Sequence, residues 1–266
     1  MAKQVWLTLV SQDAAYDPVP LLNAMGSVGI EARGGRFDYG ASPLQWSELM
    51  NTLAQQPDVD AWILAIDAAS AERPEIRYAL SLTAAHLAAV RGPGFHMGLL
   101  SLDASDAPTE LPFLLSRLTP YAIANVSWAA SLVARLFSPT AAPGDDWRLN
   151  VHADTYVGQW FEVGPVSQWH GALFGVSQTG CDHQVPAITH VAVGPRGALP
   201  QRAVLEYPVK DMKLQVGDDA YTAWAVSNEL AADQSFYVKV EGLPRSIVFA
   251  GSPGEDQALV NVVRLG

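Results

Sequence analysis

The spacing of short apolar runs changes at about residue 138, and this change constrains the fold more than any other feature. Before it, compact runs such as Val5–Val10 and Ala61–Ile66 alternate with longer segments whose apolar residues recur at helical spacing. After it, short and partly alternating runs follow one another, separated by Gly, Pro, Asp and Asn. The pattern predicts an α/β domain followed by an all-β sandwich or barrel domain.

Strands and helices alternate in the first part. The predicted strands are Val5–Val10, Ile30–Phe37, Ala61–Ile66, Phe95–Leu102 and Tyr121–Val126. The predicted helices cover 19–28, 42–53, 74–90 and 128–137, with Ser42 as N-cap and Pro43 in the first turn of the second helix. Strands separated by helices favour a parallel five-stranded sheet with helices on both faces.

Ten short runs predict the strands of the second part. They are 147–151, 159–163, 172–176, 187–193, 203–209, 212–216, 221–226, 236–240, 246–249 and 259–263. Gly217-Asp218-Asp219 lies between two of them and predicts a hairpin turn. The small, Pro- and Gly-containing segment 139–146 is predicted to link domains at 1–138 and 147–266.

Charge and cysteine content narrow the choice of partner and compartment. The chain of 266 residues has a net charge of -11, with 8 basic and 13 acidic residues up to residue 143 and 8 and 14 after it. Both parts would repel phosphate backbones and anionic lipids, so neither nucleic acid nor a membrane is the expected partner. The single cysteine excludes an intramolecular disulfide, and we expect a cytoplasmic protein.

Four aspartates follow predicted strands of the first part. Asp13, Asp38, Asp67 and Asp103 could converge at the carboxyl edge of the sheet, where parallel sheets bind ligands. Carboxylates there could bind Mg²⁺ or ribose hydroxyls. The alternative is that each aspartate caps the helix or turn that follows it.

A phosphate-binding loop is absent from the sequence after the first strand. Ser11-Gln12-Asp13-Ala14-Ala15 contains no glycine, so it matches neither the dinucleotide fingerprint nor the P-loop. A dinucleotide-dependent dehydrogenase is therefore not expected, and the sequence predicts no particular cofactor.

Residues 57–67 look like the strand of a receiver domain that ends in the phosphoacceptor aspartate. The resemblance implies a flavodoxin-like fold for residues 1–138, with Asp67 as the acceptor. Receivers usually carry an acidic pair after the first strand and a lysine after the fifth. Here only Asp13 stands near the first position, and Ala124-Asn125-Val126-Ser127 offers no lysine.

Residues 67–80 also resemble the corresponding segment of TIR-like domains. In the NAD-cleaving members a glutamate stands near the start of the helix after the third strand, often with a serine before it. The resemblance implies that Glu75 is the catalytic carboxylate and that Ser70 assists it. The Trp-Cys pair usual before this glutamate is replaced by Arg73-Pro74. The alternative is that Glu75 complements the helix dipole.

The second part contains one group of metal-ligand types and many aromatic residues. Cys181, His183 and His190 are weak candidates for a zinc site, with a spacing that matches no standard motif. Trp160 and Phe161 are adjacent in a predicted strand, so one of them must point away from the core. Such an aromatic could stack on a sugar or contact a protein.

These observations favour a non-catalytic regulatory or scaffold protein. It would act through a protein partner or as a homo-oligomer, with a nucleotide-type small ligand at the α/β domain. The alternative is a TIR-like enzyme that cleaves NAD or another nucleotide with Glu75. A carbohydrate-binding β domain is a third hypothesis.

Overall fold

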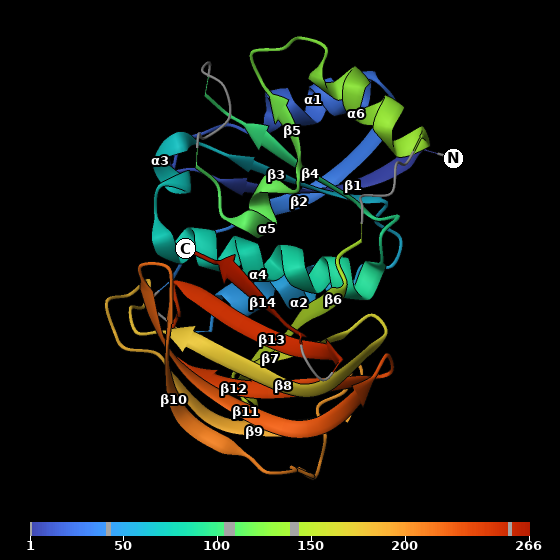
Figure 1. Cartoon of the computed structure of the whole chain (residues 1–266). Helices are drawn as coiled ribbons and strands as arrows, with labels where there is room; N and C mark the ends of the chain where they lie inside the picture. The colour runs from blue at the N-terminus through green and yellow to red at the C-terminus, as the bar shows by residue number, and fades with distance from the viewer. Residues whose placement is uncertain (1, 41–43, 104–109, 139–143, 255–256) are drawn as a thin grey trace. The chain divides into compact units, whose positions relative to one another are not determined.

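The computed structural model describes residues 2–40, 44–103, 110–138, 144–254 and 257–266 (Figure 1). The chain divides into two compact units, 1–41 with 48–143 and 42–47 with 144–266. The first contains a parallel sheet with helices and the second contains two antiparallel sheets, so the predicted fold classes are confirmed. Most of the predicted linker 139–146 lies outside the described residues. Within the described part, no helix has the length and apolar character needed to cross a membrane.

The sheet of the first unit has the strand order β2-β1-β3-β4-β5, and all its pairs are parallel. The strands are β1 (Lys3–Val10), β2 (Ile30–Arg36), β3 (Ala61–Ile66), β4 (His96–Ser101) and β5 (Thr119–Ala122). Strand β3 is central and every residue in it is buried, as its continuous apolar run predicts. The last strand was predicted at 121–126, but the chain turns after Ala122, where the Asn125 N–H donates to the Ala122 carbonyl oxygen.

Helices cover both faces of this sheet (Figure 1). Helices α1 (Val19–Ser27) and α6 (Trp128–Phe137) pack on one face, where Leu21 and Leu132 join the core formed by Leu7, Leu9 and their neighbours. Helices α2 (Trp46–Ala54) and α4 (Pro74–Arg91) lie on the other face. The predicted cap at Ser42-Pro43 lies outside the described residues.

Two short helices were not predicted from the sequence. They are α3 (Ala68–Ala71) and α5 (Phe113–Ser116), each of four residues. Such a segment is too short to show a helical period, so its position depends on its cap and its contacts.

The second unit consists of a four-stranded and a five-stranded antiparallel sheet. The four-stranded sheet has the order β6-β7-β12-β9, with β6 (Trp147–Asp154), β7 (Gly158–Pro165), β12 (Gln234–Glu241) and β9 (Ala187–Pro195). The five-stranded sheet has the order β10-β11-β8-β13-β14, with β10 (Val209–Val216), β11 (Asp219–Ala231), β8 (Gln168–Ser177), β13 (Ser246–Gly254) and β14 (Gln257–Arg264). Phe161 of β7 meets Phe174 of β8 with ring centroids 5.3 Å apart, so the apolar faces of the sheets pack together as in a sandwich.

Two sequence predictions in this unit have different outcomes. The hairpin turn is confirmed, because Val216 pairs with Asp219 and Gly217 has φ 59°, which suits the first central position of a type II′ turn. The strand predicted at 203–209 is wrong, since only Val209 belongs to a strand. Tyr207 has φ 45°, a left-handed conformation that interrupts an extended chain.

Candidate functional site

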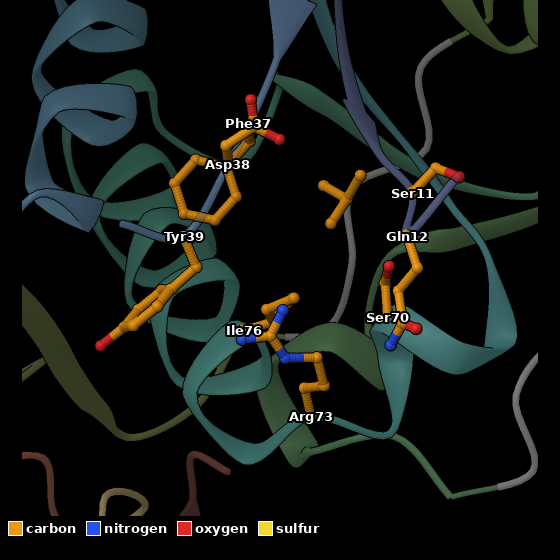
Figure 2. Close-up of a pocket in the computed structure, with 9 residues that line it drawn as sticks. Ser11, Gln12, Phe37, Asp38, Tyr39, Ser70, Arg73 and Ile76 are labelled. Carbon is orange, nitrogen blue, oxygen red and sulfur yellow. The ribbon is translucent and has the colours of Figure 1, made fainter. Parts of the chain in front are cut away.

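A pocket of about 480 Å³ opens at the carboxyl edge of the parallel sheet (Figure 2). Its lining comes from the ends of two strands and from α3 and the start of α4. The lining residues are Val10, Ser11, Gln12, Phe37, Asp38, Tyr39, Ser70, Arg73 and Ile76. Figure 2 shows Ser11, Gln12 and Ser70 on one side, Phe37 and Tyr39 on the other, and the Arg73 side chain extending between them.

The strand order explains why a pocket forms at this edge. Strand β1 lies between β2 and β3, so the chain leaves β1 toward one edge of the sheet and continues from β3 toward the other. Connections that depart in opposite directions leave a crevice beyond the carboxyl ends, and open α/β sheets bind ligands at such switch points.

Asp67 and Ser70 form the base of the α3 side. The Asp67 carboxylate accepts hydrogen bonds from the backbone N–H groups of Ser70 (2.7 Å) and Gln12 (2.9 Å), so it caps α3 and ties the end of β3 to the end of β1. Burial alone would raise the pKa of Asp67, but hydrogen bonds from Ser11, Ser70 and Gln12 lower it below its ordinary value. Asp67 is therefore an ionised cap.

Asp38 is the strand-end aspartate that lines the pocket. It is exposed and lies two residues beyond the end of β2. From this position it can accept hydrogen bonds from ligand hydroxyls, as an acidic residue does for ribose in the dinucleotide-binding fold, whose strand order differs from this one.

Arg73 brings a positive charge into the same pocket. It is the N-cap residue of α4, and its side chain is 42% exposed. Its Nε donates to Glu75 Oε1 over 2.8 Å, so the residue predicted to be catalytic forms an ion pair with it. Glu75 is 22% exposed and does not line the pocket, although its neighbours Arg73 and Ile76 do.

The other two strand-end aspartates bind backbone groups. Asp13 accepts a hydrogen bond from the Ala15 N–H over 2.9 Å, and Asp103 accepts one from the Ala68 N–H over 2.6 Å. The four aspartates thus do not gather around one ligand position. Asp38 lines the pocket, Asp67 supports it, Asp13 fixes a turn, and Asp103 binds the first residue of α3.

The three weak metal candidates are dispersed. Cys181 is buried with its sulfur near the Pro244 carbonyl oxygen, His183 is exposed, and His190 lies on β9. Within the described ranges, no group of three or more His, Cys, Asp or Glu side chains is placed to hold a metal ion.

Sequence reasoning did not identify Phe37, Tyr39 and Arg73 as pocket residues. They follow or precede regular elements, and strand-end position would have pointed to Phe37 and Tyr39. In the sequence, Arg73 stands out only because it replaces part of the Trp-Cys pair of TIR-like domains.

Comparisons with known proteins give no family for this chain. No family model matches it, and no curated protein does. Two matched structures are of translation elongation factor SelB from Methanococcus maripaludis, one in the apo form and one in complex with the GTP analogue GppNHp. The apo structure is 8% identical and has a TM-score of 0.32, with 100% of this chain and 80% of that chain covered. The complex is 7% identical with a TM-score of 0.29, covering 99% and 79%.

Proposed function

We propose that this chain is a non-catalytic regulatory or scaffold protein whose α/β unit binds a small ribonucleotide-type ligand. The observation that carries the proposal is that Asp38 and Arg73 line one pocket at the switch point of the sheet. A carboxylate there suits ribose hydroxyls, and a guanidinium suits a phosphate.

The engagement of the other acidic groups supports a role in binding rather than in catalysis. Asp67 is held ionised by N–H donors, and Glu75 is paired with Arg73. A general acid or base needs a pKa near the operating pH and reach to the reacting atoms. A lowered pKa removes Asp67 from that role.

A thermal-shift titration tests the ligand part of the proposal. NAD, AMP and ADP are added to the wild type, to Asp38→Asn and to Arg73→Gln. The controls are Asp58→Asn and Arg33→Gln, which remove the charges of an exposed ion pair (2.7 Å) in the same unit. Binding stabilises by RT ln(1 + [L]/Kd), so we expect a shift in the wild type and the controls that the pocket variants lack. The absence of a shift with every nucleotide would contradict the proposal.

The proposed action also includes contact with a protein partner or a second copy of this chain. Sedimentation and light scattering of the wild type, with and without the stabilising nucleotide, measure self-association. A change in mass on ligand addition is the expected result for a homo-oligomeric regulator. For a hetero-partner, the mass stays that of one chain until the partner is added.

Nucleotide cleavage is the alternative function, and the position of Glu75 favours it. The carboxylate is partly exposed in the first turn of α4, between two residues that line the pocket. If the chain is such an enzyme, Glu75→Gln abolishes nicotinamide release from NAD and leaves the melting temperature nearly unchanged. A wild type that releases no nicotinamide removes this alternative.

A further inference from the structure

The outward face of the four-stranded sheet in the second unit carries side chains in register across all four strands. Phe161 of β7 points into the core, so Trp160 beside it points outward. The pairing places His152 opposite Trp160, Trp160 opposite Lys239, and Lys239 opposite His190. These four residues, named the outer row here, come from four strands and lie side by side.

A buried carboxylate fixes one end of the outer row. Glu162 is 3% exposed and occupies the next outward position of β7. Its oxygens lie within 3.0 Å of the donors His152 Nε2, Asn150 Nδ2, Ser235 Oγ and the Gly197 N–H. Burial alone would raise the pKa of Glu162, but these hydrogen bonds lower it to about 2. The ionised carboxylate therefore holds the His152 ring in one orientation.

A loop covers Glu162 and leaves the outer row accessible. The Gly197 N–H binds Glu162, the Ala198 N–H donates to the Tyr237 hydroxyl, and that hydroxyl donates to the Pro195 carbonyl oxygen. In the outer row, by contrast, His190 is exposed and the other three side chains are half-buried. The face thus has a closed part, which orients the His152 ring, and an open part that a ligand can reach.

The open part combines an aromatic ring with side chains that can form hydrogen bonds. The Trp160 indole N–H donates to the Val157 carbonyl oxygen over 3.1 Å, so the half-buried ring is fixed. Lys239 Nζ lies 5.9 Å from its centroid, and the His190 ring lies 6.5 Å away. His152 Nδ1 has no hydrogen-bond partner among the described residues, which leaves it to form a hydrogen bond with a ligand hydroxyl.

We propose that the outer row binds a saccharide that carries a carboxylate or sulfate group. The C–H face of a sugar ring packs on Trp160, a hydroxyl binds His152 Nδ1, and the acidic group binds Lys239 and His190. Hydroxyls suit this row better than an apolar protein surface does, because the row contains no aliphatic side chain. The Lys239 ammonium selects an acidic sugar over a neutral one within a chain whose net charge is -11.

Calorimetric titration of the full chain tests this site. The probes are an oligoglucuronate, a sulfated oligosaccharide, a neutral oligoglucoside of equal length and an acidic polyglutamate peptide. The variants are Trp160→Ala, Trp160→Phe and Lys239→Gln. The control is Lys213→Gln, which removes an exposed lysine from β10 of the other sheet.

We expect at least one of the two acidic saccharides to bind. Comparison of the oligoglucuronate with the sulfated oligosaccharide distinguishes a carboxylate ligand from a sulfate ligand. Trp160→Ala weakens binding by about tenfold, the equivalent of about 1.4 kcal/mol, whereas Trp160→Phe retains most of it. Lys239→Gln removes the preference for the acidic saccharide over the neutral one, and Lys213→Gln leaves the affinities unchanged. The proposal is overturned if no saccharide binds, if Lys239→Gln leaves the preference intact, or if polyglutamate binds more tightly than the sugars. A Trp160→Ala protein that melts like the wild type and still binds fully also overturns it.

Discussion

At the scale of single residues, the polar groups of the α/β unit divide into those that hold the chain and those that face the pocket. Asp67 shows the first role, since its carboxylate binds two backbone N–H groups from different segments. Asp38 shows the second, since it is exposed and lines the pocket. A strand-end aspartate is therefore not evidence for a ligand until its partners are known.

Removal of the Asp67 carboxylate should destabilise the first unit. Asp67→Ala leaves the N–H groups of Ser70 and Gln12 without their acceptor, and we expect a loss of about 1–2 kcal/mol in the free energy of unfolding. Chemical denaturation measures the loss. Asp13→Ala is the control, because Asp13 accepts one N–H bond in an exposed turn and should cost less. Equal losses of stability in the two variants would contradict the role given to Asp67 as an acceptor for two backbone N–H groups.

The depressed pKa of Glu162 predicts an acid-sensitive contribution to stability. A carboxylate whose folded pKa lies below its unfolded value stabilises the protein above the unfolded pKa, here 4.5, and loses that effect as pH falls toward the folded value of about 2. The contribution is on the order of 3 kcal/mol.

Denaturation of the wild type and Glu162→Gln between pH 2 and 7 checks this prediction. The difference in stability between the two proteins should be constant above pH 5 and shrink as pH falls from 4.5 to 2. A difference that does not vary with pH would show that the Glu162 charge contributes nothing.

At the scale of the elements, edge strand β2 depends on a close backbone approach. A Cβ built on Gly34 would lie 1.8 Å from the Leu7 carbonyl oxygen, whereas one on Gly35 meets nothing within 4 Å. Gly34→Ala therefore has to displace the pairing of β2 with β1 and should lower the melting temperature by several degrees. Gly35→Ala is the matched control and should leave it unchanged or slightly higher. Differential scanning calorimetry measures the melting temperatures of both variants, and equal values would contradict this prediction.

The sequence predicted regular elements well where the pattern is long or continuous. Ala61–Ile66 and the helix over 128–137 have the predicted limits, because an apolar run and a helical period are local properties. The four-residue helix α3 has no such period. The false strand at 203–209 has apolar residues, but its Glu206 N–H donates to the Asn228 side chain of β11 and its carbonyl oxygen accepts from the Ser227 N–H, so the contact with β11 is not a regular strand pairing.

The candidate sites were less accessible to sequence reasoning because they depend on long-range pairing. The sequence predicts Asp38 and Ser70 as site residues, whereas Arg73 reaches the same pocket because of the strand order of the sheet. In the outer row, His152 and His190 are brought together by registers that link segments far apart in the chain. Alternation within one strand indicates that one of Trp160 and Phe161 points outward, but it does not indicate which residues of other strands lie beside it.

At the scale of the whole molecule, the negative charge is spread over both parts of the sequence. A chain with a net charge of -11 and no cluster of Lys or Arg should not gain counterion release from nucleic acid. We expect no binding to duplex DNA or single-stranded RNA at about 0.15 M salt, near physiological ionic strength. Fluorescence anisotropy with labelled oligonucleotides measures this, and binding that weakens with added salt would contradict the expectation.

The buried sulfur of Cys181 gives this chain a built-in probe of local opening. It is the single cysteine of the sequence and is 5% exposed, so a thiol reagent can label it only when its surroundings open. When reclosing is faster than labelling, the labelling rate follows the population of the open form. One unmodified side chain can therefore report, in unaltered protein, how often the surroundings of the residue open, and whether a sugar on the outer row slows that opening.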